Sequence, residues 1–123
     1  MRRLVVSAVA AACCAGVAAG CGTGKHQKVP GASVSAGKNL IAHYGCGACH
    51  QIGGLDSANG HVGPSLKNFQ KSIPFIVGKL PNTPDNVARW IENPQSILPS
   101  GIMPNLGVKP QEARDIAAYL YTQ

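Results

Sequence analysis

The chain has 123 residues, a formal net charge of +6 and only 5% aromatic residues. A chain of this length forms one small domain, which buries a modest core by itself. With so few aromatic side chains, we expect a bound apolar group to complete that core. The basic residues are scattered, without long runs or interleaved aromatic residues, so nothing in the composition favours nucleic-acid binding.

The first 20 residues have the pattern of a secretory signal. A basic start is followed by an apolar stretch over residues 4–19, which is shorter than the roughly 20 residues of a comfortable membrane span. Residues 17–21, Val-Ala-Ala-Gly-Cys, are similar to the lipobox of bacterial lipoproteins, in which the cysteine is acylated. We therefore predict a lipoprotein-type signal over residues 1–20 and lipidation of Cys21. Ordinary signal cleavage is the alternative, because Ala18 stands where leucine is usual.

Residues 21–36 are small and polar and have no helical periodicity. This composition predicts a flexible, lipid-anchored tether, and a coil of this length typically reaches about 20 Å. Residues 37–123 are predicted to form the folded domain. The expected location is outside the cell's cytoplasm, on the outer face of the cytoplasmic membrane or in the periplasm, with the lipid as membrane anchor.

The domain shows short helical patterns separated by Gly/Pro loops and no alternating strand pattern, which predicts an all-α fold. A first helix is expected over about residues 37–44. A second should begin with Thr83 as N-cap and Pro84 at the first helical position, and should end before Pro94. The last helix should start near Pro110, with apolar residues on one face at helical spacing: Ala113, Ile116, Ala117 and Leu120.

The stretch Cys46-Gly47-Ala48-Cys49-His50 has the C-x-x-C-H spacing that is typical of covalent c-type haem attachment. In this chemistry the two thiols add across the haem vinyl groups and the adjacent histidine ligates the iron. A lone C-x-x-C is also found in zinc sites and in redox dithiols. The zinc alternative lacks a second cysteine pair, and the dithiol alternative lacks a surrounding βαβ pattern. The sequence therefore predicts one covalent haem c.

A second axial ligand is expected on the other face of the iron, and Met103 is the favoured candidate. It precedes a proline in a Gly/Pro-containing loop, where a ligand can be presented rigidly. A neutral, soft thioether sulfur raises the reduction potential of a haem. The alternatives are the histidines outside the attachment motif: His26, His43 and His61.

Several further blocks occur in a fixed order around this motif: residues 37–41, 45–50, 62–66, 80–91, 103–104 and 115–120. In this order, residues 37–121 resemble a class I cytochrome c. They are most similar to the cytochrome c domain fused to subunit II of bacterial haem-copper oxidases, here expected as a free-standing lipoprotein. The resemblance implies the cytochrome c fold, with short helices packed around one covalently attached haem.

The resemblance also implies roles for individual residues. Cys46 and Cys49 would hold the haem thioethers, and His50 and Met103 would be the iron ligands. The carbonyl of Pro64 would accept a hydrogen bond from the other ring nitrogen of His50, which fixes its tautomer. Two more side chains would line the haem pocket: Leu66 and Trp90.

For Trp90, simple packing on a helix face is an equally good interpretation. The resemblance further implies a close crossing of the first and last helices at Gly37, with Tyr119 nearby.

Together these features predict a monohaem c-type cytochrome that transfers single electrons in a membrane-associated respiratory chain. The expected partners are redox proteins, such as a quinol-oxidising complex and a terminal oxidase or reductase. We expect a monomer with no small-molecule substrate and no enzymatic activity. One alternative is a haem enzyme or gas sensor, peroxidase-like, with a labile sixth position. The other is a fixed electron-entry subunit of an oxidase or reductase complex.

Overall fold

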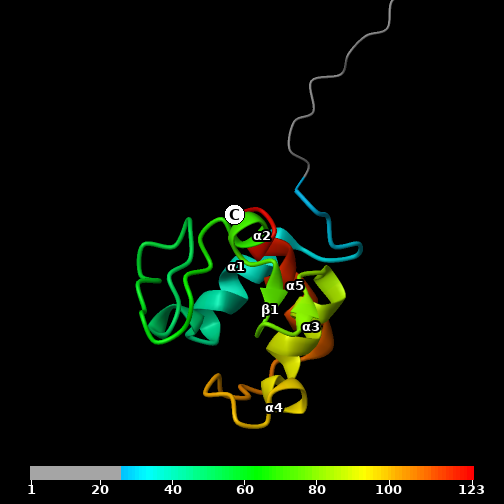
Figure 1. Cartoon of the computed structure of the whole chain (residues 1–123). Helices are drawn as coiled ribbons and strands as arrows, with labels where there is room; N and C mark the ends of the chain where they lie inside the picture. The colour runs from blue at the N-terminus through cyan, green and yellow to red at the C-terminus, as the bar shows by residue number, and fades with distance from the viewer. Residues whose placement is uncertain (1–25) are drawn as a thin grey trace, which may run out of the picture.

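The computed structural model describes residues 26–123, and the predicted signal and Cys21 lie outside this range. The described part is mostly helical, as predicted, with five α-helices, one 3-10 turn and a small two-stranded sheet (Figure 1). The elements in chain order are α1 Val34–His43, η1 Cys46–Ala48, α2 Phe69–Ser72, β1 Phe75–Ile76, β2 Leu80–Pro81, α3 Pro84–Glu92, α4 Pro94–Ile97 and α5 Pro110–Leu120.

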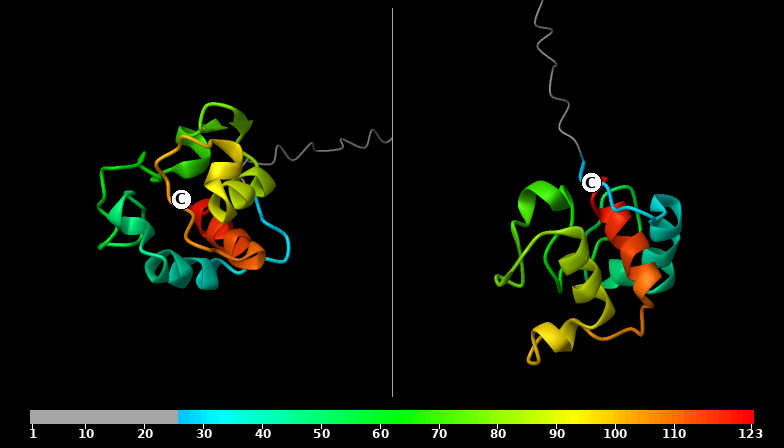
Figure 2. Two further views of the ribbon diagram at one scale, coloured as in Figure 1. Left: turned by 90° about the horizontal axis from the view of Figure 1, so that it is seen from below. Right: turned by 90° about the vertical axis from the view of Figure 1, so that its right-hand side faces the viewer.

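The centre of the domain is α5, which packs against both α1 and α3 (Figure 2). The crossing of α1 and α5 depends on Gly37, because a Cβ at this position would overlap the backbone carbonyl of Asp115. The expected close crossing at Gly37 is therefore present. Tyr119, also on α5, is buried, and its hydroxyl donates a hydrogen bond to the Gly53 carbonyl at 2.9 Å.

The segment before α1 differs from the sequence-based expectation. The first helix begins at Val34 rather than at residue 37, because the Ser33 hydroxyl caps it by accepting a hydrogen bond from the Ala36 amide at 3.2 Å. Residues 26–36 do not form the flexible coil that their composition indicated. We call residues 26–33 the N-terminal strap.

The strap is held on the domain by apolar packing, chiefly of Val29, and by hydrogen bonds to α5. Val29 is only 7% exposed and belongs to the core. The buried Asp115 accepts a hydrogen bond from the Ser33 amide at 2.8 Å. Two further α5 side chains donate to strap carbonyls: Gln111 to Gly31 at 3.1 Å and Arg114 to Pro30 at 3.0 Å.

The second predicted helix, α3, begins as expected. The Thr83 hydroxyl accepts a hydrogen bond from the Asn86 amide, Pro84 is the first helical residue, and the helix ends at Glu92. A salt bridge of 3.0 Å between Asp85 and Arg114 joins α3 to α5.

The two-stranded sheet was not predicted from the sequence. The strands pair antiparallel, Phe75 with Pro81 and Ile76 with Leu80. Each has two residues, which is too short to produce an alternating pattern in the sequence.

In the described range, every helix falls short of the length and apolar character that crossing a membrane requires.

Candidate functional site

The C-x-x-C-H stretch forms a tight turn directly after α1. Gly45 ends the helix in the left-handed conformation, with φ of 69°, which glycine adopts without strain. The turn closes through hydrogen bonds from the Ala48 amide to Gly45 O and from the His50 amide to Cys46 O, both at 3.0 Å. Cys46 and Cys49 are free thiols and half-buried. The local backbone thus presents both thiols and the imidazole from one compact turn.

A glycine-containing loop packs against this turn. The Gly60 amide donates to Gly47 O at 3.0 Å, and the Gly63 amide donates to Cys49 O at 2.8 Å. A Cβ at Gly60 would overlap the backbone of Ala48 and Cys49. The absence of side chains at these glycines therefore lets the backbone of the loop contact the backbone of the turn, and the hydrogen bonds between them stabilise the turn.

The His50 imidazole is oriented by a backbone carbonyl. Its Nδ1 lies 2.8 Å from Pro64 O, and because a carbonyl oxygen only accepts, Nδ1 carries the proton. The hydrogen bond that the resemblance implied is thus present in the structure. Protonation of Nδ1 leaves the lone pair on Nε2, which is the form of histidine that binds a metal.

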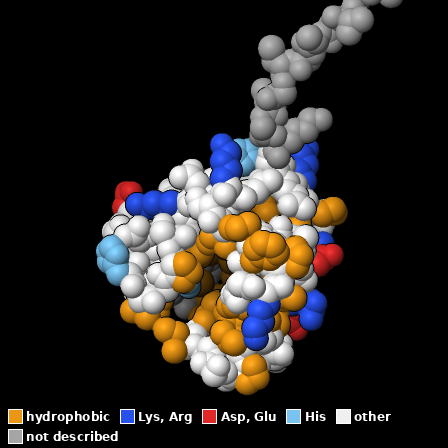
Figure 3. Space-filling view, in the orientation of Figure 1, with side chains coloured by type: hydrophobic (Ala, Val, Ile, Leu, Met, Phe, Trp, Pro, Cys, Tyr) orange, Lys and Arg blue, Asp and Glu red, His pale blue; other side chains and the backbone are white. Residues whose placement is uncertain are grey.

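An apolar cavity lies beside the turn, and it appears as a hollow with a largely hydrophobic wall in the space-filling view (Figure 3). Cys46, His50 and Met103 all line it, so a thiol, an imidazole and a thioether face one apolar space. The remaining lining residues are aliphatic: Ile41, Ile52, Leu66, Ile91, Leu106, Val108, Ile116 and Leu120. This donor set fits an iron-containing, largely apolar group such as haem c.

Burial also affects the first thiol of the motif. The apolar surroundings of Cys46 raise the pKa of its thiol, and the neighbouring Cys49 acts in the same direction. The protonated thiol is therefore favoured at neutral pH, and Cys46 is not an activated nucleophile of the kind found in thiol enzymes.

Some predicted site residues lie outside the cavity wall. Cys49 is on the same turn, and Pro64 contacts His50 from behind. Trp90 is half-buried and packs against the hydrophobic core, and it is not among the residues that line this cavity. Leu66 does line it.

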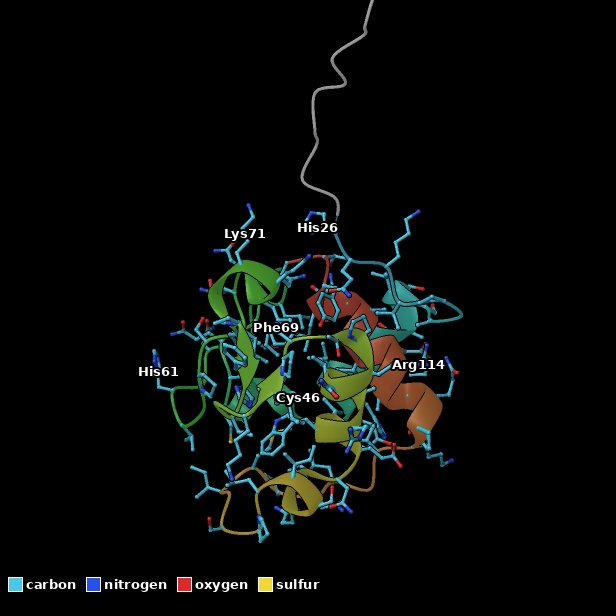
Figure 4. The ribbon with its side chains drawn as sticks, turned by 45° about the vertical axis from the view of Figure 1, so that its right-hand side comes forward. His26, Cys46, His61, Phe69, Lys71 and Arg114 are labelled. Carbon is cyan, nitrogen blue, oxygen red and sulfur yellow. The ribbon has the colours of Figure 1, made fainter. Side chains whose placement is uncertain are left out.

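The rival histidines lie away from the cavity wall. His61 is exposed and hydrogen-bonded to Gln51, and His26 contacts the Tyr121 carbonyl at 3.0 Å. Both point outward in Figure 4, whereas the half-buried Cys46 lies near the centre of this view. His43 is exposed on α1.

Two features of the site were not predicted from the sequence. The first is the packing of Gly60 and Gly63 on the attachment turn, because glycines in a loop carry no signal in the sequence of which backbone they approach. The second is Gln95, whose side-chain amide donates to the Met103 carbonyl at 2.6 Å. A contact between a helix and a loop eight residues further on has no signature in the sequence.

A mainly helical domain that presents a C-x-x-C-H turn and a methionine to one apolar cavity defines the class of c-type cytochrome domains. The chain belongs to the cytochrome c family, whose model matches residues 34–123. The chain is also similar to cytochrome c oxidase subunit 2 of Alkalihalophilus pseudofirmus, with 31% identity over 85 residues. That match covers 68% of this chain and 24% of the relative, so the chain spans about a quarter of that protein's length.

These comparisons confirm the predicted resemblance to a class I c-type cytochrome and to the cytochrome domain of oxidase subunit II. They also confirm the cytochrome c fold. Membership of the family identifies the protein as a haem c-type electron carrier and implies covalently bound haem c.

Proposed function

We propose that this protein is a monohaem cytochrome that carries single electrons in a membrane-associated respiratory chain, with His50 and Met103 as axial ligands. Cys46 and Cys49 would form the thioether bonds. The observation that carries the proposal is that Cys46, His50 and Met103 line the same apolar cavity. When bound there, haem c supplies a centre that gains and loses one electron at its iron.

The residues of the chain contribute orientation and an apolar environment. The Pro64 carbonyl keeps the proton on Nδ1 of His50, which leaves Nε2 available as a ligand. The aliphatic wall excludes water and disfavours extra charge on the oxidised centre. Met103 would add a neutral, soft donor, which favours the reduced state of a haem iron. If His50 and Met103 both bound the iron, no ligand position would be left for a substrate, so we propose a carrier rather than an enzyme.

The proposed partners are redox proteins of the respiratory chain. The similarity to an oxidase subunit supports a terminal oxidase or reductase as acceptor, and a quinol-oxidising complex is the proposed donor. The same similarity is compatible with a fixed electron-entry subunit. Co-purification with an integral membrane enzyme after mild detergent extraction would favour the fixed subunit over a mobile carrier.

We further propose that the protein is exported, is anchored by a lipid at Cys21 and is a monomer. The sequence around Cys21 supports the anchor. Mass spectrometry of the mature N-terminus tests it, since a diacylglyceryl cysteine is expected at position 21. An unmodified N-terminus would exclude the anchor.

The central experiment is an absorption spectrum of the protein matured with haem, oxidised and reduced, before and after addition of carbon monoxide. We expect sharp reduced c-type bands, a weak far-red iron–sulfur band in the oxidised form, and no shift with carbon monoxide. Met103→Ala should lose the far-red band and bind carbon monoxide. His61→Ala is the matched control for a rival ligand and should change neither property.

A carbon monoxide shift in the unmutated protein would contradict the proposal. It would mean that the sixth position is open, and the haem enzyme or gas sensor would become the better interpretation.

A further inference from the structure

Gln95 is the first residue after the proline that opens the single-turn helix α4. Pro94 is fully buried, and the Asn93 side chain caps the turn by accepting a hydrogen bond from the Ser96 amide at 3.3 Å. The start of α4 is therefore fixed in the domain. From this fixed position, the half-buried Gln95 side chain donates through Nε2 to the Met103 carbonyl at 2.6 Å.

The loop that carries Met103 forms few other hydrogen bonds with the rest of the domain. For residues 102–108, the hydrogen bonds in the described structure that reach another element are the Gln95 contact and a longer one, 3.4 Å, from Asn105 to Asn93. Ile102, directly before Met103, is 80% exposed. Pro104, directly after it, has no amide to donate. Both contacts thus come from α4 and its cap, and the shorter one is made by the Met103 backbone itself.

We propose that Gln95 is a positioning residue that holds Met103 at the cavity, and so sets how firmly the Met103 sulfur occupies the sixth position of the iron. This inference rests on the proposed function, because it requires Met103 to be a ligand. Gln95 acts on the backbone of Met103 and does not itself line the cavity.

Ligation of the iron by a loop residue competes with opening of the loop. A thioether binds ferric iron weakly, so an external ligand such as imidazole displaces it whenever the loop opens. Loss of one hydrogen bond of ordinary strength makes opening about fivefold more frequent. The apparent affinity of the ferric protein for imidazole should rise by the same factor of about five.

The experiment measures imidazole binding to the ferric haem-loaded protein, together with the far-red band and the exchange rates of amides in residues 102–107. Gln95→Leu keeps the side-chain volume without a donor, and Gln95→Glu is isosteric but presents an acceptor to the carbonyl. The matched control is Gln111→Leu, because Gln111 also donates to a backbone carbonyl, that of Gly31, in the strap.

Both Gln95 variants should bind imidazole more tightly, weaken the far-red band and exchange the loop amides faster, whereas Gln111→Leu should match the unmutated protein in all three. Unchanged imidazole affinity and loop exchange in both Gln95 variants would overturn the inference.

Met103→Ala separates this inference from the function on which it rests. If Met103→Ala raises imidazole affinity strongly while the Gln95 variants do not, only the role of Gln95 is refuted. If Met103→Ala has no effect on the far-red band or on imidazole affinity, Met103 is not a ligand, and both proposals fail.

Discussion

Gly63 lies directly against the ring of His50. A Cβ at residue 63 would lie 2.7 Å from Nδ1 of the imidazole and would overlap Cε1. The next residue is Pro64, whose carbonyl accepts the Nδ1 hydrogen bond. The position of the ring and the hydrogen bond to Pro64 thus both depend on the absence of a side chain at residue 63.

Gly63→Ala should push the loop off the ring and lengthen or break the hydrogen bond from His50 to Pro64. We expect the free energy of unfolding to fall by about 2 kcal/mol, because overpacking at a tight contact costs this order of energy. The reduction potential should shift as well, since this hydrogen bond tunes the basicity of the ligand. Denaturant unfolding and potentiometric titration measure the two effects.

Gly53→Ala is the matched control for Gly63→Ala. Its Cβ would meet only the end of the flexible Gln123 side chain, which can move aside. Its stability and potential should stay close to those of the unmutated protein. Equal effects of the two substitutions would contradict the role given to Gly63.

Gly37→Ala should be the more damaging glycine substitution, because the new Cβ would collide with the backbone of Asp115 rather than with a side chain. Neither helix can relieve this contact without separating α1 from α5. We expect a loss of about 3 kcal/mol in the free energy of unfolding. Lys38→Ala, at the neighbouring exposed position on α1, should change the stability little. Chemical denaturation of the two variants under the same conditions checks the difference.

The hydrogen bond between Tyr44 and Glu112 predicts a defined dependence of stability on pH. The Tyr44 hydroxyl donates to Glu112 Oε2 at 2.6 Å, and this bond, together with the Lys109 amide, lowers the pKa of the Glu112 carboxyl. A carboxyl whose pKa is lowered by folding stabilises the protein at pH values above the pKa of the same group in the unfolded chain, which is about 4.3. That stabilisation is lost as the pH falls through the lower pKa of the folded state.

Tyr44→Phe should therefore reduce the stability at neutral pH and flatten its fall in acid, because Glu112 retains only the Lys109 contact. Melting temperatures measured from neutral pH down to about pH 3 test this. Tyr119→Phe is the control: its hydroxyl donates to the Gly53 carbonyl, which does not titrate, so the acid slope should be unchanged. If the melting temperature of Tyr44→Phe fell in acid as steeply as that of the unmutated protein, the Tyr44 hydrogen bond would not be the cause of the lowered Glu112 pKa.

The N-terminal strap should contribute to stability through Val29. Val29→Ala removes apolar volume from a side chain that is 7% exposed, and we expect a loss of about 2 kcal/mol. Val34→Ala makes the same chemical change at a side chain that is 43% exposed and should cost much less. Hydrogen exchange at the Ser33 amide, which donates to Asp115, should be slow in the unmutated protein and faster in Val29→Ala. Rapid exchange in the unmutated protein would show that the strap is not docked.

The sequence predicted the elements whose ends carry strong local signals. Thr83 and Pro84 marked the start of α3, and Pro110 marked the start of α5. Pro94 was interpreted only as the end of a helix, although proline is equally suited to the first position of a new one, as in α4. The start of α1 was placed too late because the capping role of Ser33 is stabilised by its contact with Asp115, far along the chain.

In the candidate site, too, local features were predicted from the sequence and tertiary contacts were not. Cys46, Cys49 and His50 are adjacent in sequence, so their shared chemistry was predicted from spacing alone. The contact between His50 and Pro64 was expected only through resemblance to a family. The contact between Gln95 and Met103 was not expected at all, because it depends on how α4 lies against a loop. Tertiary contacts of this kind become visible only once the helices are packed.

The docked strap changes how a lipid at Cys21 would restrict the domain. With the strap folded against α5, the linking segment runs from residue 21 to residue 26 rather than to residue 37. A segment of about five residues spans at most about 17 Å in any conformation, compared with more than about 50 Å for sixteen. An anchored domain would then search for partners in two dimensions, within a layer close to the lipid headgroups. Electron donors and acceptors whose docking faces stand well above that layer would be out of reach.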